Sequence, residues 1–184
     1  MNLPASVEGR ERLRLFCALT LPDKVLDDLV RWQREELVSE ARALGRDHLH
    51  VTLAFLGHRP TEEVEPIAAA LGESAAAAGQ IVLAPRRYRE TRSVGMLVFD
   101  DEEGRATALA GDLHGRLEQL GVYEPEKRLW LPHVTVLRFK RPPRLAPTLP
   151  GLGAFSPSGA ALYHSVLRSG GAQYEVLESV ALGG

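Results

Sequence analysis

His50-Val51-Thr52-Leu53-Ala54 and His133-Val134-Thr135-Val136-Leu137 carry the same pattern, in which a histidine, a valine and a threonine are followed by apolar residues. Successive side chains of a β-strand point to opposite faces, so each histidine shares a face with the threonine two positions on. If the two strands lie side by side, two imidazoles and two hydroxyls converge. These groups are sufficient for acid–base chemistry on a phosphate without a metal.

The sequence around these motifs predicts alternating strands and helices. Pro22 suits a first helical turn, Gly45 a helix end and Thr61 an N-cap. Four prolines exclude regular structure from residues 141–150, leaving a loop near the site or a strap over the surface. Pro85 indicates a bulge or an edge strand. We expect strands at residues 12–20, 47–55, 80–90, 93–99, 130–139, 160–168 and 173–182, and helices at 22–44, 61–78 and 105–120.

The order of these elements indicates an internal duplication. Each motif strand follows a helix, and the motif histidines lie 83 residues apart (133 minus 50). We therefore predict an α+β fold, bilobal and duplicated, with two small, mostly antiparallel sheets backed by helices. A central cleft would separate the two motif strands, and residues 1–184 would form one bilobal domain.

Charge is distributed unevenly along the chain. The formal net charge of -2 argues against indiscriminate nucleic-acid binding. Residues 127–144, however, contain six basic residues and no acidic residue, and they include the second motif. A second cluster consists of Arg86, Arg87, Arg89 and Arg92. These clusters favour an anionic ligand, and a polymer over a mononucleotide.

The remaining composition indicates an ordinary globular protein. Cys17 is the single cysteine, so an internal disulfide is excluded and a buried apolar role is expected. The sequence contains neither a signal-peptide core nor an apolar stretch of about 18 residues, the length of a membrane span. We expect a cytoplasmic monomer that does not associate with membranes.

Three stretches resemble a known family. HLHVTLAFLG (48–57), HVTVLR (133–138) and RLFCALTLP (14–22) are similar to the two-histidine phosphoesterase superfamily. Within it they are closest to the RNA 2',3'-cyclic phosphodiesterases of bacteria and archaea, also called 2'-5' RNA ligases. The resemblance implies a bilobal α+β fold, no metal and no other cofactor. It also implies a substrate that is RNA or an oligonucleotide ending in a 2',3'-cyclic phosphate.

The resemblance also implies roles for individual residues. His50 would donate a proton, His133 would accept one, and Thr52 and Thr135 would hold phosphate oxygens. Arg138 corresponds to the arginine at the end of the family's second motif. Its offset of five from His133 is odd, so it reaches the same face only if the strand ends or twists first.

The residues themselves leave several alternatives open. His48 is expected near the cleft rim as a substrate contact, and Arg141 as a further substrate-binding group. His48 and His50 also have the spacing of some metal sites, so a divalent metal is the main rival chemistry. His114 on its helix, and Tyr163 and Tyr174 on the last strands, are more simply explained as structural residues than as ligand contacts.

The main functional hypothesis is hydrolysis of 2',3'-cyclic phosphate ends to 2'-phosphates, with reversal of this reaction to 2'-5' ligation. Two alternatives stay open. One is a phosphodiesterase that acts on 2'-5' oligonucleotides or small cyclic nucleotides. The other is an RNA- or nucleotide-binding module without turnover.

Overall fold

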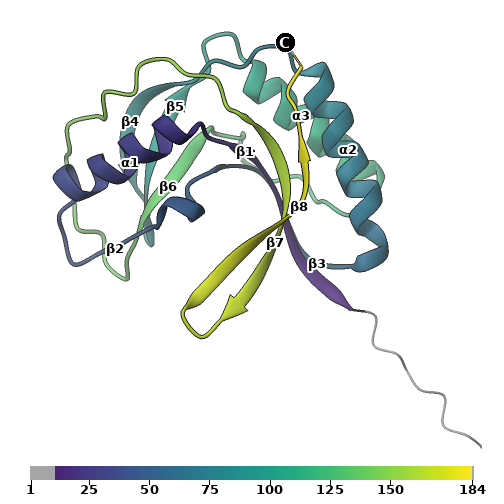
Figure 1. Ribbon diagram of the computed structural model, residues 1–184, viewed down its shortest axis with the longest axis horizontal. Coiled ribbons are helices and arrows are strands. Elements are labelled where there is room, and N and C mark those ends of the chain that lie inside the picture. Colours follow the sequence, from purple (N-terminus) through teal and green to yellow (C-terminus); the bar gives the residue numbers. More distant parts are fainter. Residues whose placement is uncertain (1–10, 184) are drawn as a thin grey trace, which may run out of the picture.

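The computed structural model describes residues 11–183, which form an antiparallel sheet with helices on its outer side (Figure 1). The first half of the chain contains β1 (Arg12–Thr20), α1 (Asp23–Glu36), β2 (Arg42–Ala43), the 3-10 turn η1 (Arg46–His48), β3 (Val51–Pro60), η2 (Thr61–Glu63) and α2 (Val64–Ala77). The second half contains β4 (Ala84–Glu90), β5 (Val94–Asp100), α3 (Arg105–Gln119), β6 (His133–Arg138), β7 (Gly159–Arg168) and β8 (Gly171–Val180).

The strands form one eight-stranded sheet in place of the two sheets expected from the sequence. Its order is β4-β5-β6-β3-β1-β7-β8, and β2 pairs with the end of β6. Every pairing is antiparallel, as predicted. The two halves of the sheet meet between β3 and β6 through the single residue pair Val51–Val134. The predicted lobes therefore exist as halves of a strongly curled sheet, because the motif strands touch at one point and diverge beyond it.

The helix that precedes a motif strand in sequence does not pack on the sheet half that contains this strand. Helix α1 precedes β3 in sequence but packs on the β4-β5-β6 half, where the Trp32 ring meets the Tyr88 ring of β4 at 6.2 Å. Helices α2 and α3 cover the other half, with α2 against β7 and β8 and α3 against β3. Figure 1 shows α1 and the α2–α3 pair on separate parts of the sheet. The helix before each motif strand thus covers the sheet half that contains the other motif strand.

The apolar face of each motif strand lies in the core. Val51 and Val134 are fully buried, as the alternation of the motif predicts. Leu97 and Phe99 of β5, Leu71 of α2 and Leu113 of α3 belong to the same buried cluster. Burial of each such side chain contributes roughly 1.5–3 kcal/mol to folding. The same packing therefore holds the fold together and keeps the histidines on the opposite face.

Several predictions of local structure are confirmed. The strand over 12–20, the helix that begins at Arg105 and the hairpin of the last two strands are present. Pro85 adjoins a bulge in the β4–β5 pairing. Of the two alternatives for the proline-rich segment, a loop near the site or a strap over the surface, the structure shows the strap. It crosses the α1 side, where Trp32 Nε1 donates to the carbonyl of Thr148 at 2.7 Å.

Three predicted boundaries were wrong, and tertiary contacts explain two of them. Helix α1 ends at Glu36 and does not reach Leu44, because Arg42 and Ala43 pair with β6 as β2. The first motif strand begins at Val51, since local hydrogen bonds close η1 over Arg46–His48. Thr61 makes no capping hydrogen bond with its side chain; its backbone N–H donates to Glu11 at 3.2 Å, and α2 begins after η2.

Two further strands begin later than predicted. The second motif strand begins at His133, not at Trp130, and β4 begins at Ala84, not at Gln80. Among the described residues, none of the helices is long and apolar enough to cross a membrane. The cytoplasmic location stays a prediction.

Candidate active site

A cavity of about 350 Å³ lies where the two motif strands meet. Its lining includes His50 and Thr52 from the first motif, and His133, Thr135 and Arg138 from the second. The predicted convergence of the two motifs is therefore confirmed. From the two motifs, two imidazoles, two hydroxyls and one guanidinium line this space.

Both imidazoles are oriented by the backbone two residues earlier. Nδ1 of His133 donates to the carbonyl of Leu131 at 2.7 Å, which leaves Nε2 for chemistry. His50 makes a corresponding hydrogen bond with the backbone of His48. Its Nε2 lies 3.1 Å from Oγ1 of Thr52, the motif threonine on the same face. Each ring therefore presents one nitrogen to the cavity.

A bulge in β6 brings Arg138 to the cavity face. Met96 of β5 pairs with Thr135, but the next residue, Gly95, pairs with Leu137. Val136 is therefore an extra residue that shifts the alternation by one position. Arg138, five residues after His133, consequently lies on the face of the histidine. This bulge resolves the odd offset noted in the sequence.

Strand β3 carries a bulge at the equivalent position. Ala18 of β1 pairs with Thr52, and Cys17 pairs with Ala54, so Leu53 has no partner of its own. Leu53 follows His50 by three residues, as Val136 follows His133. The shift brings Phe55 into the cavity lining at the position equivalent to Arg138. The two motifs thus share a backbone irregularity as well as a sequence pattern.

A helical side chain satisfies the carbonyl of each bulged residue. Gln33 of α1, which is 5% exposed, donates from Nε2 to the carbonyl of Val136 at 2.9 Å. His114 of α3 donates from Nε2 to the carbonyl of Leu53 at 2.7 Å. Buried carbonyls need such partners, and the carbonyl of Val136 also accepts the backbone N–H of Leu44 at 3.0 Å. Neither role was predicted from the sequence, where the available signal was a polar residue next to, or within, an apolar helix stripe.

Aromatic rings surround His50. Phe16 stacks on the imidazole at 4.9 Å, and Tyr174 and Tyr163 lie at 5.6 Å and 6.1 Å. Burial among these rings lowers the pKa of His50 to about 4, and electrostatic interactions with His48, His133 and Arg138 act in the same direction. The hydrogen bond with the backbone of His48 opposes the shift. His50 is therefore uncharged at neutral pH when the cavity holds no anion.

His48 connects the cavity rim to the last hairpin. The residue lines the cavity, as expected, but its Nε2 donates to the carbonyl of Ala172 at 2.8 Å. Its ring also meets the edge of Tyr174 at 4.7 Å. These contacts hold the tip of the β7–β8 hairpin against η1. Tyr174, for which a structural role was expected, lines the cavity as well.

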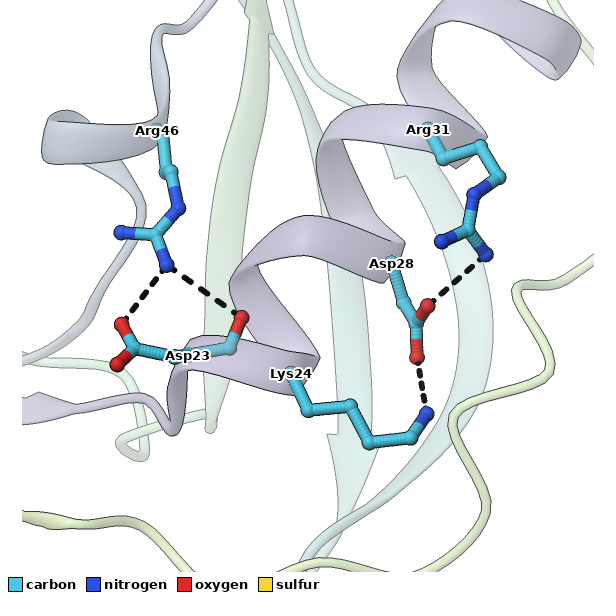
Figure 2. Close-up of polar contacts among 5 residues, drawn as sticks. All are labelled: Asp23, Lys24, Asp28, Arg31 and Arg46. Atoms are coloured by element: carbon cyan, nitrogen blue, oxygen red, sulfur yellow. Dashed lines mark hydrogen bonds and ion pairs between the residues drawn. The ribbon is translucent and has the colours of Figure 1, made fainter.

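Ion pairs fix η1 in front of the first motif. Arg46 of η1 bonds Asp23 at the start of α1 at 2.8 Å, as Figure 2 shows, and bonds Asp27 at the same distance. A separate set along α1 joins Asp28 to Lys24 and Arg31 (Figure 2). Exposed pairs of this kind contribute modestly to stability. Their effect here is to fix the position of the turn that carries His48.

Other lining residues were not singled out from the sequence. Arg14 and Arg42 add positive charge to the cavity, and the Arg14 guanidinium lies 4.9 Å from the ring centre of Phe55. Ser165 of β7 also lines the cavity and is 5% exposed; its hydroxyl has no hydrogen-bond partner among the described residues. It faces the cavity because β7 pairs with the cavity-facing β1.

Two sequence hypotheses gain no geometric support. Arg141 is exposed beyond the end of β6 and is not part of the cavity lining in residues 11–183; its role in substrate binding stays a prediction. The metal alternative requires further ligands beside His48 and His50. Within the described chain, no three histidine, cysteine, aspartate or glutamate side chains come together as a metal site.

Comparisons with known proteins agree with this geometry. The family described as "LigT like Phosphoesterase" matches residues 19–88. The chain is 33% identical to the RNA 2',3'-cyclic phosphodiesterase of Thermus thermophilus, over 94% of this chain and 91% of that protein. It is 27% identical to the protein of that name from Escherichia coli, over 94% of this chain and 98% of the relative.

A solved structure supports the same relationship. The crystal structure of E. coli LigT complexed with 3'-AMP superposes with a TM-score of 0.82 at 25% identity, covering 94% of this chain and 99% of that one. Sequence similarity and fold thus agree over nearly the whole chain. The chain belongs to the LigT-like phosphoesterase family.

Proposed function

We propose that this protein hydrolyses the 2',3'-cyclic phosphate end of RNA to a 2'-phosphate by two-histidine acid–base catalysis. The observation that carries the proposal is the convergence of His50, Thr52, His133, Thr135 and Arg138 on one cavity. The relatives named as RNA 2',3'-cyclic phosphodiesterases support the choice of substrate.

The reaction divides between the two imidazoles. His133 accepts a proton from water, whose oxygen attacks phosphorus. The bond between phosphorus and the 3' oxygen breaks, and His50 donates a proton to that oxygen. The product then carries a 2'-phosphate and a 3'-hydroxyl. Each proton transfer of this kind typically accelerates a reaction by about 10²- to 10⁴-fold.

The other lining groups hold the phosphate. The hydroxyls of Thr52 and Thr135 donate hydrogen bonds to the non-bridging oxygens, where negative charge accumulates in the transition state. Arg138 adds a permanent positive charge with two donors in a fork. Ser165 offers a buried hydroxyl that has no partner within residues 11–183, suited to a polar group of the bound ribose phosphate.

The low pKa of His50 is compatible with its role as the acid. A bound cyclic phosphate places a negative charge between the imidazoles, which raises the pKa of His50 and favours its protonation. The aromatic surroundings hold this proton weakly, so His50 transfers it readily to the leaving oxygen. Binding of the anionic substrate thereby charges the acid only in the complex.

The same chemistry in reverse joins a 2',3'-cyclic end to a 5'-hydroxyl and creates a 2'-5' linkage. Water at about 55 M competes with the 5'-hydroxyl, so hydrolysis is the expected net direction. Both motifs of one chain meet in the cavity, and we therefore expect the monomer to be active.

The test is turnover of a short RNA that ends in a 2',3'-cyclic phosphate, in excess EDTA, with the product resolved as 2'- or 3'-phosphate. We expect the 2'-phosphate. A 3'-phosphate would reverse the assignment of the leaving oxygen. Activity that appears only when a divalent metal is added would replace the proposal with a metal site at His48 and His50.

A further inference from the structure

We propose that Arg87 and Arg89 on β4 bind the phosphates of the RNA strand 5' to the cyclic end. These two residues are called the β4 arginine pair below. The inference rests on the proposed function, because it concerns the part of the same substrate that lies outside the catalytic cavity. It separates these two arginines from the rest of the basic cluster in the sequence.

Strand register places the β4 arginine pair on the catalytic face of the sheet. Arg87 pairs with Val98 of β5, and Val98 pairs with His133 of β6. In the next row, Arg89 pairs with Met96, which pairs with Thr135. Directly opposed residues of antiparallel strands have side chains on the same face. Each arginine therefore ends a row that begins at a motif residue.

The alternate residues of β4 point to the other face. Tyr88 meets the Trp32 ring of α1 and donates from its hydroxyl to Glu90 at 3.1 Å. Glu90 in turn accepts backbone N–H groups of the proline-rich strap at Arg144 and Leu145. Helix α1 and the strap thus cover the face opposite the β4 arginine pair.

The β4 arginine pair is exposed, and its charge is not neutralised within residues 11–183. Arg86, the neighbouring residue, has an ion pair with Asp100 at 3.5 Å. Arg87 and Arg89 have no ion pair among the described residues. Two exposed guanidiniums on the face of the catalytic cavity fit phosphates, the anionic groups that repeat along RNA.

The distance between β4 and β6 places the β4 arginine pair beside the RNA strand and not beside its cyclic phosphate end. Neighbouring strands lie about 4.8 Å apart, so the backbones of β4 and β6 are about 10 Å apart. The cyclic phosphate held by His133 and Thr135 is therefore contacted by Arg138, whereas the β4 arginine pair meets phosphates further along. A cyclic mononucleotide would occupy the cavity without reaching this pair.

The experiment compares a 2',3'-cyclic mononucleotide with a six-nucleotide RNA that ends in the same cyclic nucleotide. In the double variant Arg87→Gln/Arg89→Gln, we expect kcat/KM for the RNA to fall about tenfold at low salt while the value for the mononucleotide is unchanged. Each lost phosphate contact reduces the salt slope by roughly 0.7 for a single strand, so the plot of log kcat/KM against log salt should flatten by about 1.4.

The matched control is Arg31→Gln/Arg34→Gln, which removes the same charge from α1 on the opposite side of the sheet. It should leave the RNA, the mononucleotide and the salt slope as they are in the wild type. Equal losses in both double variants would show a general charge effect and overturn the proposal. An unchanged preference for RNA in the β4 variant would overturn it too.

A binding measurement separates this inference from the proposed function. Fluorescence anisotropy of the same RNA with a 2'-phosphate end reports affinity without turnover. Weaker binding by the β4 variant alone supports the arginine pair, even if the wild type hydrolyses neither substrate and the proposed function fails. Equal affinity of the wild type and the β4 variant rejects the pair, even if hydrolysis is confirmed.

Discussion

The two motif strands share their backbone geometry but differ in what surrounds the histidine. Each places a bulge three residues after its histidine, and each bulge has its carbonyl bonded by a helix from elsewhere in the chain. At the fifth position, however, β3 brings Phe55 into the cavity and β6 brings Arg138. The same kind of bulge therefore brings an apolar side chain to one side of the cavity and a charged side chain to the other.

The difference extends to the neighbouring strands. His50 lies among Phe16, Tyr163 and Tyr174, whereas the strand next to β6 leads across Met96 and Val98 to the β4 arginine pair. Aromatic surroundings disfavour charge on an imidazole, whereas exposed arginines attract anions. Equivalent positions around the two motif histidines therefore differ in chemical character.

Loss of either histidine should have the largest effect. We expect His50→Ala and His133→Ala each to lower kcat by about 10²- to 10⁴-fold, since each removes a proton-transfer group. The double variant should be little worse than either single variant, because the two groups act as a unit. Single-turnover hydrolysis of RNA with a cyclic end measures this. His58→Ala, at an exposed position of β3, is the control and should keep the wild-type activity. Substantial activity in either motif variant would show that the two motif histidines are not equally required.

Exchange of the fifth-position residues should have a smaller and unequal effect. Arg138→Gln removes charge-assisted hydrogen bonds of about 1.5–3 kcal/mol, so kcat/KM should fall roughly 10- to 100-fold. Phe55→Leu keeps an apolar side chain and should cost only a few-fold. Steady-state kinetics with one RNA substrate checks the ratio. Equal losses would show that the two side chains have the same task.

Removal of the two bulge anchors should cost stability. His114→Phe leaves the carbonyl of Leu53 without its side-chain donor, and Gln33→Leu removes the side-chain donor shared by the carbonyls of Leu44 and Val136, of which Val136 keeps the backbone N–H of Leu44. Loss of such a donor costs about 1–3 kcal/mol in the free energy of unfolding, and we expect Gln33→Leu to lie at the lower end. Urea denaturation measures this, with Gln119→Leu at the exposed end of α3 as a control expected within about 0.5 kcal/mol of the wild type.

Kinetics can distinguish the same two anchors. The bulge held by Gln33 positions Arg138, so Gln33→Leu should also lower kcat/KM. The bulge held by His114 positions Phe55, so His114→Phe should change kcat/KM less. The opposite order would contradict the assignment of charge to one strand and packing to the other.

The pH dependence of stability tests the aromatic surroundings of His50. The pKa of His50 is about 4 in the folded chain and, with an ordinary value of about 6.5 when unfolded, the unfolded state binds more protons between these values. Stability is therefore fully present above pH 6.5 and is lost as pH falls toward 4, by at most about 3 kcal/mol.

Urea unfolding at several pH values should show this slope in the wild type and a reduced slope in His50→Gln. Inorganic phosphate in the cavity should raise the pKa of His50, which an NMR titration of its imidazole would record. An unshifted pKa in the free chain would show that the aromatic cluster does not exclude water from the ring.

Much of the site was determined by the sequence itself. Alternation along a strand is a local property, so the sequence placed His50 with Thr52, and His133 with Thr135, on one face. Apolar periodicity likewise predicted the strand over 12–20 and the helix from Arg105. The repeat of the motif indicated that the two pairs meet, and the structure confirms it.

Only the tertiary structure decided how the remaining groups reach the cavity. Helix α1 stops at Glu36 because β6 captures Arg42 and Ala43, and the two expected sheets fuse through the pair Val51–Val134. The bulge that turns Arg138 inward depends on the register with β5 and on the donor from Gln33. Register and bulges are properties of two strands together, and no single stretch of sequence contains the partner that sets them.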